Sequence, residues 1–464
     1  MTTTTPRNAS GIHCPDELDD TASALMRTEL GNAERLVLRH GVDLRFHTDT
    51  SRWLVWDGTR WRPDTTGETM RAAKSTVRAI YREAALGTAK EARDALAKHA
   101  TVSESNRALK AMIALAASEA DIPVESAELD ADPMLFNVAN GSLDLRTGEL
   151  RPHDRSDLCT KISPVPYDPD ATCPRWRQLL GEVFDDPALP DFLQSLFGYT
   201  LTGDISEQSV IVMFGDGANG KTTLLNVLLE LAGDYGLQAA PDLLLADRRD
   251  HHPTAQADLQ GRRPVVTSEI NQGRAFDEAL VKRLAGGDLI KARRMRQDFF
   301  TFAPSHTMFL AVNHKPCVVG DDHGIWRRLV PIRFPNQFNG RHRDPQLAAK
   351  LRAELPGILA WAVEGATRWA ADGQLNPPDS VEQERSRYRA ENNPLAGFLA
   401  DRCHIEADAT VSSKDLNNAY LDWHRLYGSG QPETQRSVGL KLRTLGFDKS
   451  TSGTVTWHGL RLRP

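Results

Sequence analysis

The sequence predicts a multidomain α/β protein whose central domain contains a largely parallel β-sheet. A chain of 464 residues is too long for one hydrophobic core, and about three domains are expected. Between residues 206 and 372, apolar β-type runs alternate with helical patterns, as in a parallel sheet connected by helices. The first run, 209–214, is a continuous β-type run and leads through glycines into a helical pattern over 221–231. We therefore expect the α/β core at residues 206–372.

The composition is that of a globular protein without a membrane-spanning segment or a secretory signal. Hydrophobic residues make up 40% of the chain and charged residues 25%, which is ordinary globular composition. No apolar stretch is long enough to cross a bilayer, and the Thr-rich start lacks the apolar segment of a secretory signal. The net charge of −6 requires that any affinity for nucleic acid come from local basic surfaces.

The cysteines argue against two kinds of small stabilised domain. They lie far apart, with no Cys-x-x-Cys pair, so neither a zinc module nor a disulfide framework is expected. They are Cys14, Cys159, Cys173, Cys317 and Cys403. A reducing cytoplasm is the environment that this pattern predicts.

The chain before the core is expected to hold a tail and an α+β domain. Residues 1–31 are polar and acidic, which is typical of a disordered tail. Residues 32–165 combine a helix, a Trp-rich hairpin at 45–61, Ala-rich helices at 70–120 and a second hairpin at 135–150. We expect the tryptophans to pack the first hairpin rather than to bind a ligand.

Helical segments are expected on both sides of the core. Residues 166–205 follow a Pro-rich boundary and have apolar residues at three- and four-residue spacing, which predicts a helical collar. Residues 373–393 contain prolines and are expected to be a linker. Residues 394–464 show three helical patterns and a strand pair around Ser452-Gly453, which predicts a winged-helix-like domain.

A phosphate-binding loop is the strongest motif. Residues 215–222 satisfy G-x-x-x-x-G-K-[ST] between an apolar strand and a helix, and this context argues against a chance match. The motif predicts ATP with Mg²⁺, because backbone N–H groups would face the phosphates, Lys221 would reach the β/γ-phosphates and Thr222 would ligate the metal. The expected nucleotide-binding residues are Gly215, Asp216, Gly217, Ala218, Asn219, Gly220, Lys221, Thr222 and Thr223.

A carboxylate at the end of the next apolar strand completes the expected metal site. Residues 264–268 form the strand, and Glu269 follows it. Such a carboxylate positions Mg²⁺ or the attacking water in enzymes with a phosphate-binding loop. The alternative is an ordinary charged residue at a strand end.

Four features in order resemble the superfamily-3 helicases, in particular the phage and plasmid primase-helicase family that includes the poxvirus primase-helicase. The likeness covers most of the chain from about Asn32. It rests on the phosphate loop, the Glu269 strand, the stretch 282–296, and the segment 311–316 followed by 324–329. The regions 136–150 and 198–203 also look like the part of that family that precedes the motor. The resemblance implies a P-loop NTPase core, AAA+-like.

The resemblance implies further catalytic roles. Glu269 matches the Walker B acid, although related helicases often carry two adjacent acids where this chain has Ser268-Glu269. Asn313 matches a sensor asparagine that holds the lytic water, and a turn-forming Asn is the alternative. Arg328, favoured over Arg327, matches an arginine finger for a neighbouring subunit's ATP, and a surface salt bridge is the alternative.

Two basic groups are expected to contact DNA. The resemblance makes the stretch after residue 290 a hairpin lining the central channel of a ring, where cations follow single-stranded DNA. A solvated face is the alternative for such a charge run. A third C-terminal helix would enter duplex DNA in a helix-turn-helix arrangement, or serve protein contacts. The residues are Lys291, Arg293, Arg294 and Arg296 in the hairpin and Arg436, Lys441 and Arg443 in the helix.

The resulting hypothesis is a ring-forming DNA helicase, expected as a hexamer, that uses Mg²⁺-ATP in phage or plasmid replication in a bacterial host's cytoplasm. Only some 30 residues precede the resembled region, so we expect no N-terminal primase polymerase domain. Priming would then need a separate primase or polymerase chain. Two alternatives stay open: an ATP-regulated origin-binding initiator without processive unwinding, and a phosphotransferase acting on a small metabolite.

Overall fold

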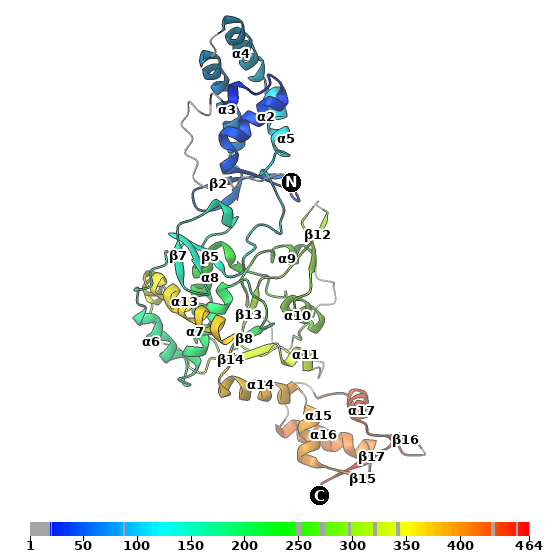
Figure 1. Cartoon of the computed structure of the whole chain (residues 1–464). Helices are drawn as coiled ribbons and strands as arrows, with labels where there is room; N and C mark the ends of the chain where they lie inside the picture. Colours follow the sequence, from blue (N-terminus) through cyan, green and yellow to red (C-terminus); the bar gives the residue numbers. More distant parts are fainter. Residues whose placement is uncertain are drawn as a thin grey trace. The chain divides into compact units, whose positions relative to one another are not determined.

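The structure is a computed structural model that describes residues 19, 21–86, 89–246, 253–268, 274–295, 298–318, 323–339, 344–392, 394–427, 432–451 and 453–463. Two compact units divide the chain: Met1–Leu143 with Leu150–Ile162, and Asp144–Glu149 with Ser163–Pro464 (Figure 1). Among the helices described, none is long and apolar enough to span a bilayer.

The first unit combines helices with two small sheets. Its helices are α2 (Glu29–His40), α3 (Glu68–Leu86), α4 (Lys90–Ser103) and α5 (Asn106–Ala116), with the 3₁₀ helices η1 (Gly41–Asp43) and η2 (Arg155–Asp157). One sheet has the order β3-β2-β1-β4, with β1 (Leu44–His47), β2 (Arg52–Trp56), β3 (Trp61–Pro63) and β4 (Pro123–Val124). The other contains β5 (Leu135–Val138), β6 (Gly141–Asp144) and β7 (Glu149–Arg151).

The tryptophans pack the first sheet, as the sequence predicted. Trp61 is fully buried, and its ring centroid lies 5.7 Å from that of Trp56. Trp53 packs on the other face, where Leu36 and Val77 of α2 and α3 form the apolar cluster under the sheet. Alternate residues of β2 therefore pack into two different small cores, because successive side chains of a strand point to opposite faces of the sheet.

A buried ion pair fixes helix α2 against α3. Arg35 donates from Nε to Glu83 Oε2 at 2.8 Å, and both side chains are fully buried. The other Arg35 nitrogens donate to the carbonyls of Leu25, Met26 and Gly31. Each nitrogen of the guanidinium thus has a hydrogen-bond partner, which is the condition under which a buried charge is tolerated.

The expected disordered tail, residues 1–31, differs from the described part of this region. Residues 1–18 and 20 lie outside the described residues. Helix α2 begins at Glu29, where Thr28 Oγ1 accepts a hydrogen bond from Gly31 N at 3.1 Å. Asp19 is buried and pairs with Arg39. An acidic residue that looked like part of a solvated tail is therefore held by one basic residue of α2 and one of α3, Arg39 and Arg82.

The second unit contains a five-stranded sheet in the order β14-β8-β13-β10-β9, in which every pairing is parallel. Its strands are β8 (Val210–Phe214), β9 (Leu237–Gln238), β10 (Pro264–Ser268), β13 (Thr307–Val312) and β14 (Leu329–Arg333). All residues of β8 and β13 are buried, as expected for a parallel sheet covered on both faces. The predicted α/β class with a parallel sheet is confirmed.

Helices and one hairpin complete this unit. The helices are α6 (Pro174–Val183), α7 (Leu189–Leu201), α8 (Lys221–Ala232), α9 (Pro253–Ala257), α10 (Glu278–Ala285), α11 (His323–Trp326), α12 (Leu347–Ala353) and α13 (Leu355–Asp372), with the 3₁₀ helix η3 (Gly233–Tyr235). An antiparallel hairpin consists of β11 (Ile290–Arg293) and β12 (Phe299–Phe302).

Two glycines allow helices α7 and α13 to pack at backbone contact. A Cβ on Gly198 would lie 2.4 Å from the carbonyl oxygen of Ala362, and one on Gly365 would lie 1.9 Å from that of Gln194. Trp361 also packs on Trp176 of α6, with ring centroids 5.5 Å apart. The region expected as a helical collar is therefore bound to a helix that follows the sheet in sequence.

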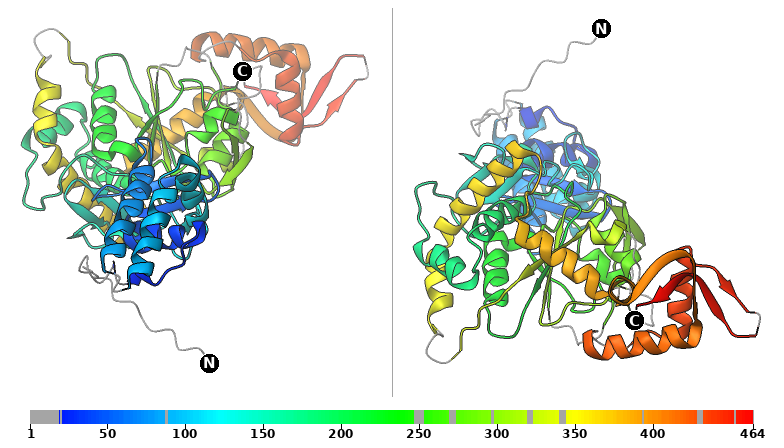
Figure 2. Two further views of the ribbon diagram at one scale, coloured as in Figure 1. Left: turned by 90° about the horizontal axis from the view of Figure 1, so that it is seen from above. Right: turned by 90° about the horizontal axis from the view of Figure 1, so that it is seen from below.

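The end of the chain forms a cluster of helices and strands with its own core (Figure 2). Its elements are α15 (Pro394–Arg402), β15 (Cys403–Ser412), α16 (Ser413–Tyr427), α17 (Gln435–Thr444), β16 (Lys449–Ser450) and β17 (Thr456–Leu462). The three helices and the β16–β17 pair match the expected elements, but strand β15 was missed. Five of its ten residues are exposed, so it lacks the apolar pattern of a buried strand.

The segment expected as a linker, 373–393, mostly forms helix α14 (Asp379–Asn392). Tyr388 of this helix is almost fully buried and belongs to the core around the sheet. Most other residues of α14 are polar, so its amino-acid pattern did not predict a packed helix. One aromatic side chain and specific polar contacts hold it instead.

Replacing Glu83 with Ala should destabilise the first unit by about 3–5 kcal/mol, because it leaves the buried Arg35 charge unpaired. Chemical denaturation followed by far-UV circular dichroism measures this loss. Arg71→Ala is the matched control, since Arg71 is exposed and its ion pair with Glu68 should contribute at most about 1 kcal/mol. Equal effects of the two substitutions would contradict the importance assigned to the buried pair.

Candidate active site

The loop between β8 and α8 has the backbone of a phosphate cradle. Gly215, Ala218 and Gly220 have φ values of +142°, +59° and +92°, which curl the chain around the start of α8. A Cβ on Gly215 would lie 2.4 Å from the carbonyl oxygen of Phe334, so only glycine fits there. The free N–H groups and the dipole at the start of this twelve-residue helix favour an anion.

Lys221 holds its ammonium group inside the loop. Its Nζ donates to the carbonyl oxygen of Gly215 at 2.6 Å and to Asn219 Oδ1 at 2.9 Å, with a longer contact of 3.4 Å to Asn313 Oδ1. Burial lowers the pKa of Lys221 below its ordinary value, and the Asp216 carboxylate acts in the opposite direction. A partly desolvated cation of this kind gains from an anionic partner.

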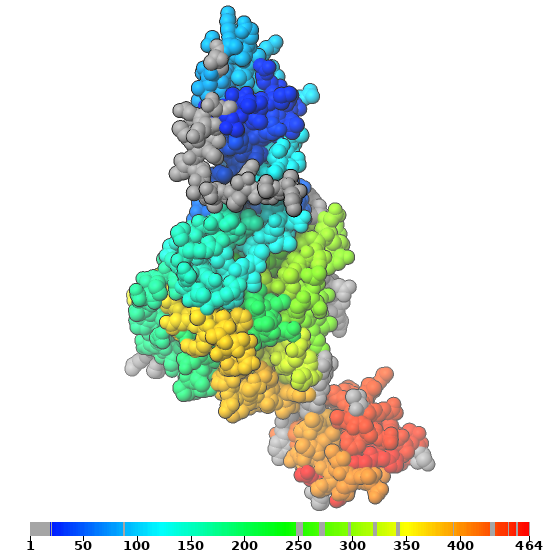
Figure 3. Space-filling view, in the orientation of Figure 1, coloured from blue at the N-terminus to red at the C-terminus, as the bar shows by residue number. Residues whose placement is uncertain are grey.

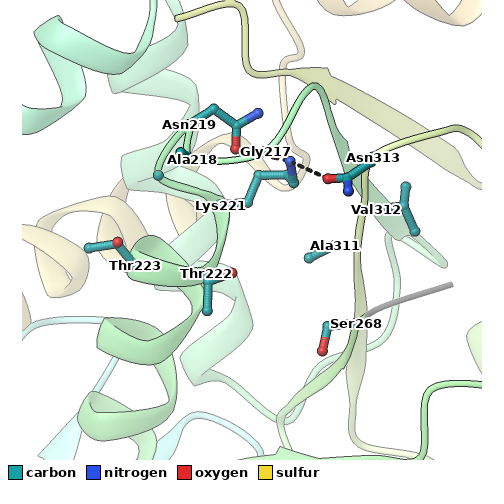
Figure 4. A pocket seen from close by; sticks show the side chains of 11 residues that line it. Gly217, Ala218, Asn219, Lys221, Thr222, Thr223, Ser268, Ala311, Val312 and Asn313 are labelled. Atoms are coloured by element: carbon teal, nitrogen blue, oxygen red, sulfur yellow. Dashed lines mark hydrogen bonds between the residues drawn. The ribbon is translucent and has the colours of Figure 1, made fainter. Parts of the chain in front are cut away.

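A cavity of about 320 Å³ joins the loop to the ends of two neighbouring strands. Its lining residues are Gly217, Ala218, Asn219, Gly220, Lys221, Thr222, Thr223, Ser268, Ala311, Val312 and Asn313. Figure 4 shows Lys221 directed toward Asn313, while the hydroxyls of Thr222 and Ser268 lie on opposite sides of the cavity. These strands are parallel, so their carboxyl ends converge on this edge.

The residues present fit a nucleotide phosphate group with a divalent cation. The cradle and Lys221 suit phosphate oxygens, and Thr222 offers a hydroxyl ligand of the kind that Mg²⁺ accepts. Glu269, the predicted carboxylate, lies outside the described residues, directly after β10. Within the parts of the chain that are described, no cluster of three His, Cys, Asp or Glu residues forms a metal site by itself.

Arg327 and Arg328 lie at the opposite edge of the sheet. The backbone N of Val210 donates to the carbonyl oxygen of Arg328 at 2.7 Å, so the pair stands where β8 begins. Gln208 Oε1 accepts from Arg327 Nη2 at 2.7 Å and from Arg328 Nη2 at 3.1 Å. The structure therefore does not bring these arginines to the loop of the same chain. Gln208, which no motif indicated, orients both.

The hairpin presents cations around an exposed aromatic ring. Lys291 Nζ lies 5.0 Å and the Arg293 guanidinium 5.3 Å from the ring centroid of Phe299, which is 51% exposed. Residues 291 and 293 share the outer face of the hairpin, whereas Ile290 and Ala292 are buried beneath it. The outer face thus combines two positive charges with one ring.

Arg294 differs from the other basic residues of the hairpin. It donates to Gln260 Oε1 at 2.7 Å, and its guanidinium stacks 4.7 Å from the ring centroid of Phe300. These contacts hold the end of β11 against the segment after α9. Arg296, also expected in this group, lies outside the described residues. The sequence pattern could not show that Arg294 has a structural partner, because that partner, Gln260, is 34 residues away in the chain.

The C-terminal basic residues are also unequal. Arg436 and Arg443 are exposed on α17, seven positions apart, and Leu440 between them is 60% exposed. Lys441 is bound to Glu433, with 2.6 Å between Nζ and Oε1. The exposed face of α17 is therefore formed by two arginines and a leucine rather than by all three predicted cations.

These features define a mixed α/β protein with a glycine-rich loop and a cavity at the carboxyl edge of a parallel sheet. Comparison with known proteins identifies its relatives. Residues 33–185 match the family model described as D5 N terminal like, and residues 213–328 match a family of unknown function, DUF5906. The chain is homologous to proteins of large DNA viruses that are named helicase or primase, and this confirms the resemblance to the primase-helicases at the level of homology.

Three relatives indicate the range of similarity. "Putative helicase L207/L206" of Acanthamoeba polyphaga mimivirus is 27% identical over 65% of this chain and 34% of its own length. "Putative primase C962R" of African swine fever virus (isolate Warthog/Namibia/Wart80/1980) is 25% identical over 68% and 35%. "Putative helicase 022R" of Frog virus 3 (isolate Goorha) is 21% identical over 64% and 39%. The chain thus spans little more than a third of these relatives.

A solved structure shares the fold. The apo structure of the NrS-1 C-terminal region superposes with a TM-score of 0.50 and 9% identity, covering 90% of this chain and 96% of that one. At this identity the likeness concerns the arrangement of elements alone.

Replacing Lys221 with Ala should weaken the binding of Mg²⁺-ATP at least about tenfold, which corresponds to about 1.4 kcal/mol. The loss follows from removing the one side-chain cation that lines the described cavity. Titration with a fluorescent ATP analogue measures the affinity, and thermal unfolding checks the fold. Lys350→Ala is the control, because Lys350 is exposed on α12 and pairs with Asp344. Unchanged affinity in the folded Lys221 variant would contradict the assignment.

Proposed function

We propose that the chain is an ATP-hydrolysing, ring-forming DNA helicase of the superfamily-3 type that acts in phage or plasmid DNA replication. The observation that carries the proposal is the placement of a phosphate cradle and an arginine pair at opposite edges of one sheet. Relatives named helicase and primase support a role in replication. A nucleotide site that needs a second subunit is the feature expected of a ring motor.

The cradle supports a defined division of chemical tasks. Lys221 exchanges its bonds to Gly215 and Asn219 for the β/γ-phosphate oxygens of ATP. Thr222 and Glu269 hold Mg²⁺, which, when bound, neutralises charge developing on the phosphoryl group. Asn313, whose Oδ1 lies within reach of Lys221 Nζ, orients the attacking water.

The distance across the sheet supports hydrolysis between subunits. Arg328 stands at the start of β8 and Gly215 follows its end. The five residues of this strand correspond to about 16 Å at ~3.3 Å per residue. An arginine side chain cannot span that distance within one chain. In a head-to-tail ring, the amino edge of one sheet meets the carboxyl edge of the next, and Arg328 or Arg327 reaches the neighbour's γ-phosphate.

The hairpin is suited to single-stranded DNA. Phe299 offers a face on which a base stacks, and Lys291 and Arg293 beside it bind the adjacent phosphates. Such contacts tolerate any sequence, because every base has a π-face. In the ring we propose, the hairpins of successive subunits line the channel, and Arg294 fixes the turn end of β11 in each hairpin through Gln260. Figure 3 shows the surface formed by this region in yellow-green.

The C-terminal elements support a second DNA contact. Their order, helix-strand-helix-helix-strand-strand, is that of a winged helix with α17 as the helix that enters the major groove. Arg436 and Arg443 would contact phosphates or base edges, with Leu440 between them. This same feature favours the alternative function, an ATP-regulated origin-binding initiator that does not unwind processively. Strand displacement on a forked duplex distinguishes the two functions.

Replacing Lys291 and Arg293 together with Ala should weaken binding of single-stranded DNA and slow unwinding, because two phosphate contacts per subunit are lost. The slope of log affinity against log salt should fall by roughly 0.7 for each contact. Fluorescence anisotropy over a salt series measures the slope, and ATP binding serves as the check on the nucleotide site. The paired control is Lys350→Ala with Arg352→Ala, two exposed residues of α12. An unchanged slope together with normal unwinding would show that the hairpin face is merely solvated.

Mixing two inactive variants should restore ATP hydrolysis if the arginines act between subunits. Lys221→Ala subunits keep the arginines but have a defective cradle, and Arg327→Ala/Arg328→Ala subunits keep the cradle but lack the arginines. Some interfaces of a mixed ring then join one intact cradle to one intact arginine pair. Phosphate release measures the rescue, and exchange of labelled subunits is verified in parallel. Exchange without any return of activity would refute the action in trans.

A further inference from the structure

Helix α14 contacts the chain near both the carboxyl edge and the amino edge of the parallel sheet. Lys315, two residues after Asn313, donates to Glu384 Oε1 at 2.8 Å and to Glu391 Oε2 at 2.7 Å, both on α14. Its Nζ also lies 4.8 Å from the ring centroid of Phe214, the last residue of β8. One ammonium group therefore joins α14 to the strand ends that carry the cradle and Asn313.

The surroundings of Lys315 make this contact rigid. The Lys315 side chain is 13% exposed and that of Glu384 9%, so the pair is largely shielded from solvent. Tyr388 packs its ring 4.9 Å from Lys315 Nζ and donates its hydroxyl to the carbonyl oxygen of Pro316. The backbone N of Val318 donates to Asn392 Oδ1 at 2.7 Å. The loop after Asn313 is thus fixed to α14 at three successive points.

A second set of contacts reaches the arginine pair. Arg385 Nε donates at 2.8 Å to the carbonyl oxygen of Leu329, the residue directly after Arg328. Both oxygens of Glu382 accept from Arg385 Nη1 at 2.7 Å, which holds the guanidinium in one orientation. The ring of Trp326, directly before Arg327, meets Tyr388 edge to face with centroids 5.3 Å apart. The segment bearing both arginines is therefore bounded by contacts to the same helix.

We propose that α14 is a brace that positions the two half-sites of each chain, which are its own nucleotide cradle and the arginine pair that it offers to the neighbouring subunit. Lys315 sets the geometry of the cradle, and Arg385 sets the position of the arginine pair. The inference rests on the proposed action of the arginines in trans. Neither Lys315 nor Arg385 is a catalytic residue. Lys315 acts through Asn313 and the β8 end, and Arg385 acts through the backbone that carries Arg328.

The consequence is a separation of effects by subunit. A substitution at Lys315 impairs hydrolysis at the cradle of the chain that carries it. A substitution at Arg385 impairs hydrolysis at the cradle of the adjacent chain. A substitution that only weakened the fold would lack this directionality, because a partly unfolded subunit would lose both of its half-sites.

The test uses the full chain in the mixed-subunit assay, where one subunit type supplies only the cradle and the other only the arginines. Lys315→Met is placed first in the cradle-supplying Arg327→Ala/Arg328→Ala chain and then in the arginine-supplying Lys221→Ala chain. Arg385→Met is placed in the same two chains. Gln383→Met, on the exposed side of α14, is the matched control. Maximal hydrolysis rate and KM are measured for each mixture.

The expected result is a crossed pattern. Lys315→Met lowers the maximal rate at least about tenfold in the cradle-supplying chain and less than about twofold in the other, whereas Arg385→Met does the reverse. The ATP KM should change little in both cases, since Lys221 and the cradle still bind the phosphates. Lys315→Arg, which keeps a cation for Glu384, should recover most of the rate.

Two controls keep the outcomes distinct. If Lys315→Met fails to fold because Glu384 loses its lysine partner, the charge-neutral pair Lys315→Met/Glu384→Gln replaces it. Equal losses in either chain, or no loss in either, would overturn the brace while leaving the proposed helicase intact. Failure of the unmodified mixture to hydrolyse ATP, with subunit exchange verified, would overturn the action in trans and the brace with it.

Discussion

The parallel pairing of β8 with both β13 and β14 determines where the cradle, Asn313 and the arginine pair lie. Val210 pairs with Met308 on one side and with Leu329 on the other, and Phe214 with Val312 and Arg333. Since all three strands run the same way, their carboxyl ends open on one edge, where the cradle and Asn313 meet. The same register places the arginine pair on the amino edge. A single sheet thus separates two groups that ATP hydrolysis would need together, and this separation is the argument for a neighbouring subunit.

The packing around the sheet keeps these two edges at a fixed separation. Helices α7 and α13 approach at Gly198 and Gly365 to backbone contact, and α14 is attached near both edges through Lys315 and Arg385. The polar contacts are stable because each of these charges has two partners. Lys315 has two carboxylates and Arg385 has a carboxylate and a carbonyl. Buried or half-buried charges with such partners resist rearrangement, because breaking one bond leaves a costly unpaired group.

The sequence predicted what depends on local spacing. Glycines at the cradle, the apolar run of β8 and the alternation of strands and helices are all local patterns, and the parallel sheet follows from them. It did not predict what depends on partners distant in sequence: the Arg294 contact with Gln260, the Lys441 contact with Glu433, or the packing of α14. Strand β15 was missed because its side chains are mostly polar and exposed. Glu269 and Arg296 stay predictions, since both lie outside the described residues.

Single-particle imaging of the protein with a non-hydrolysable ATP analogue and single-stranded DNA can decide whether the nucleotide lies between two subunits. We expect a closed ring in which each nucleotide lies on the cradle of residues 215–223 of one subunit. Arg328 or Arg327 of the neighbour should then stand within hydrogen-bonding distance of the γ-phosphate. A nucleotide enclosed entirely by one chain, or both arginines still bound to Gln208 and remote from every nucleotide, would contradict it.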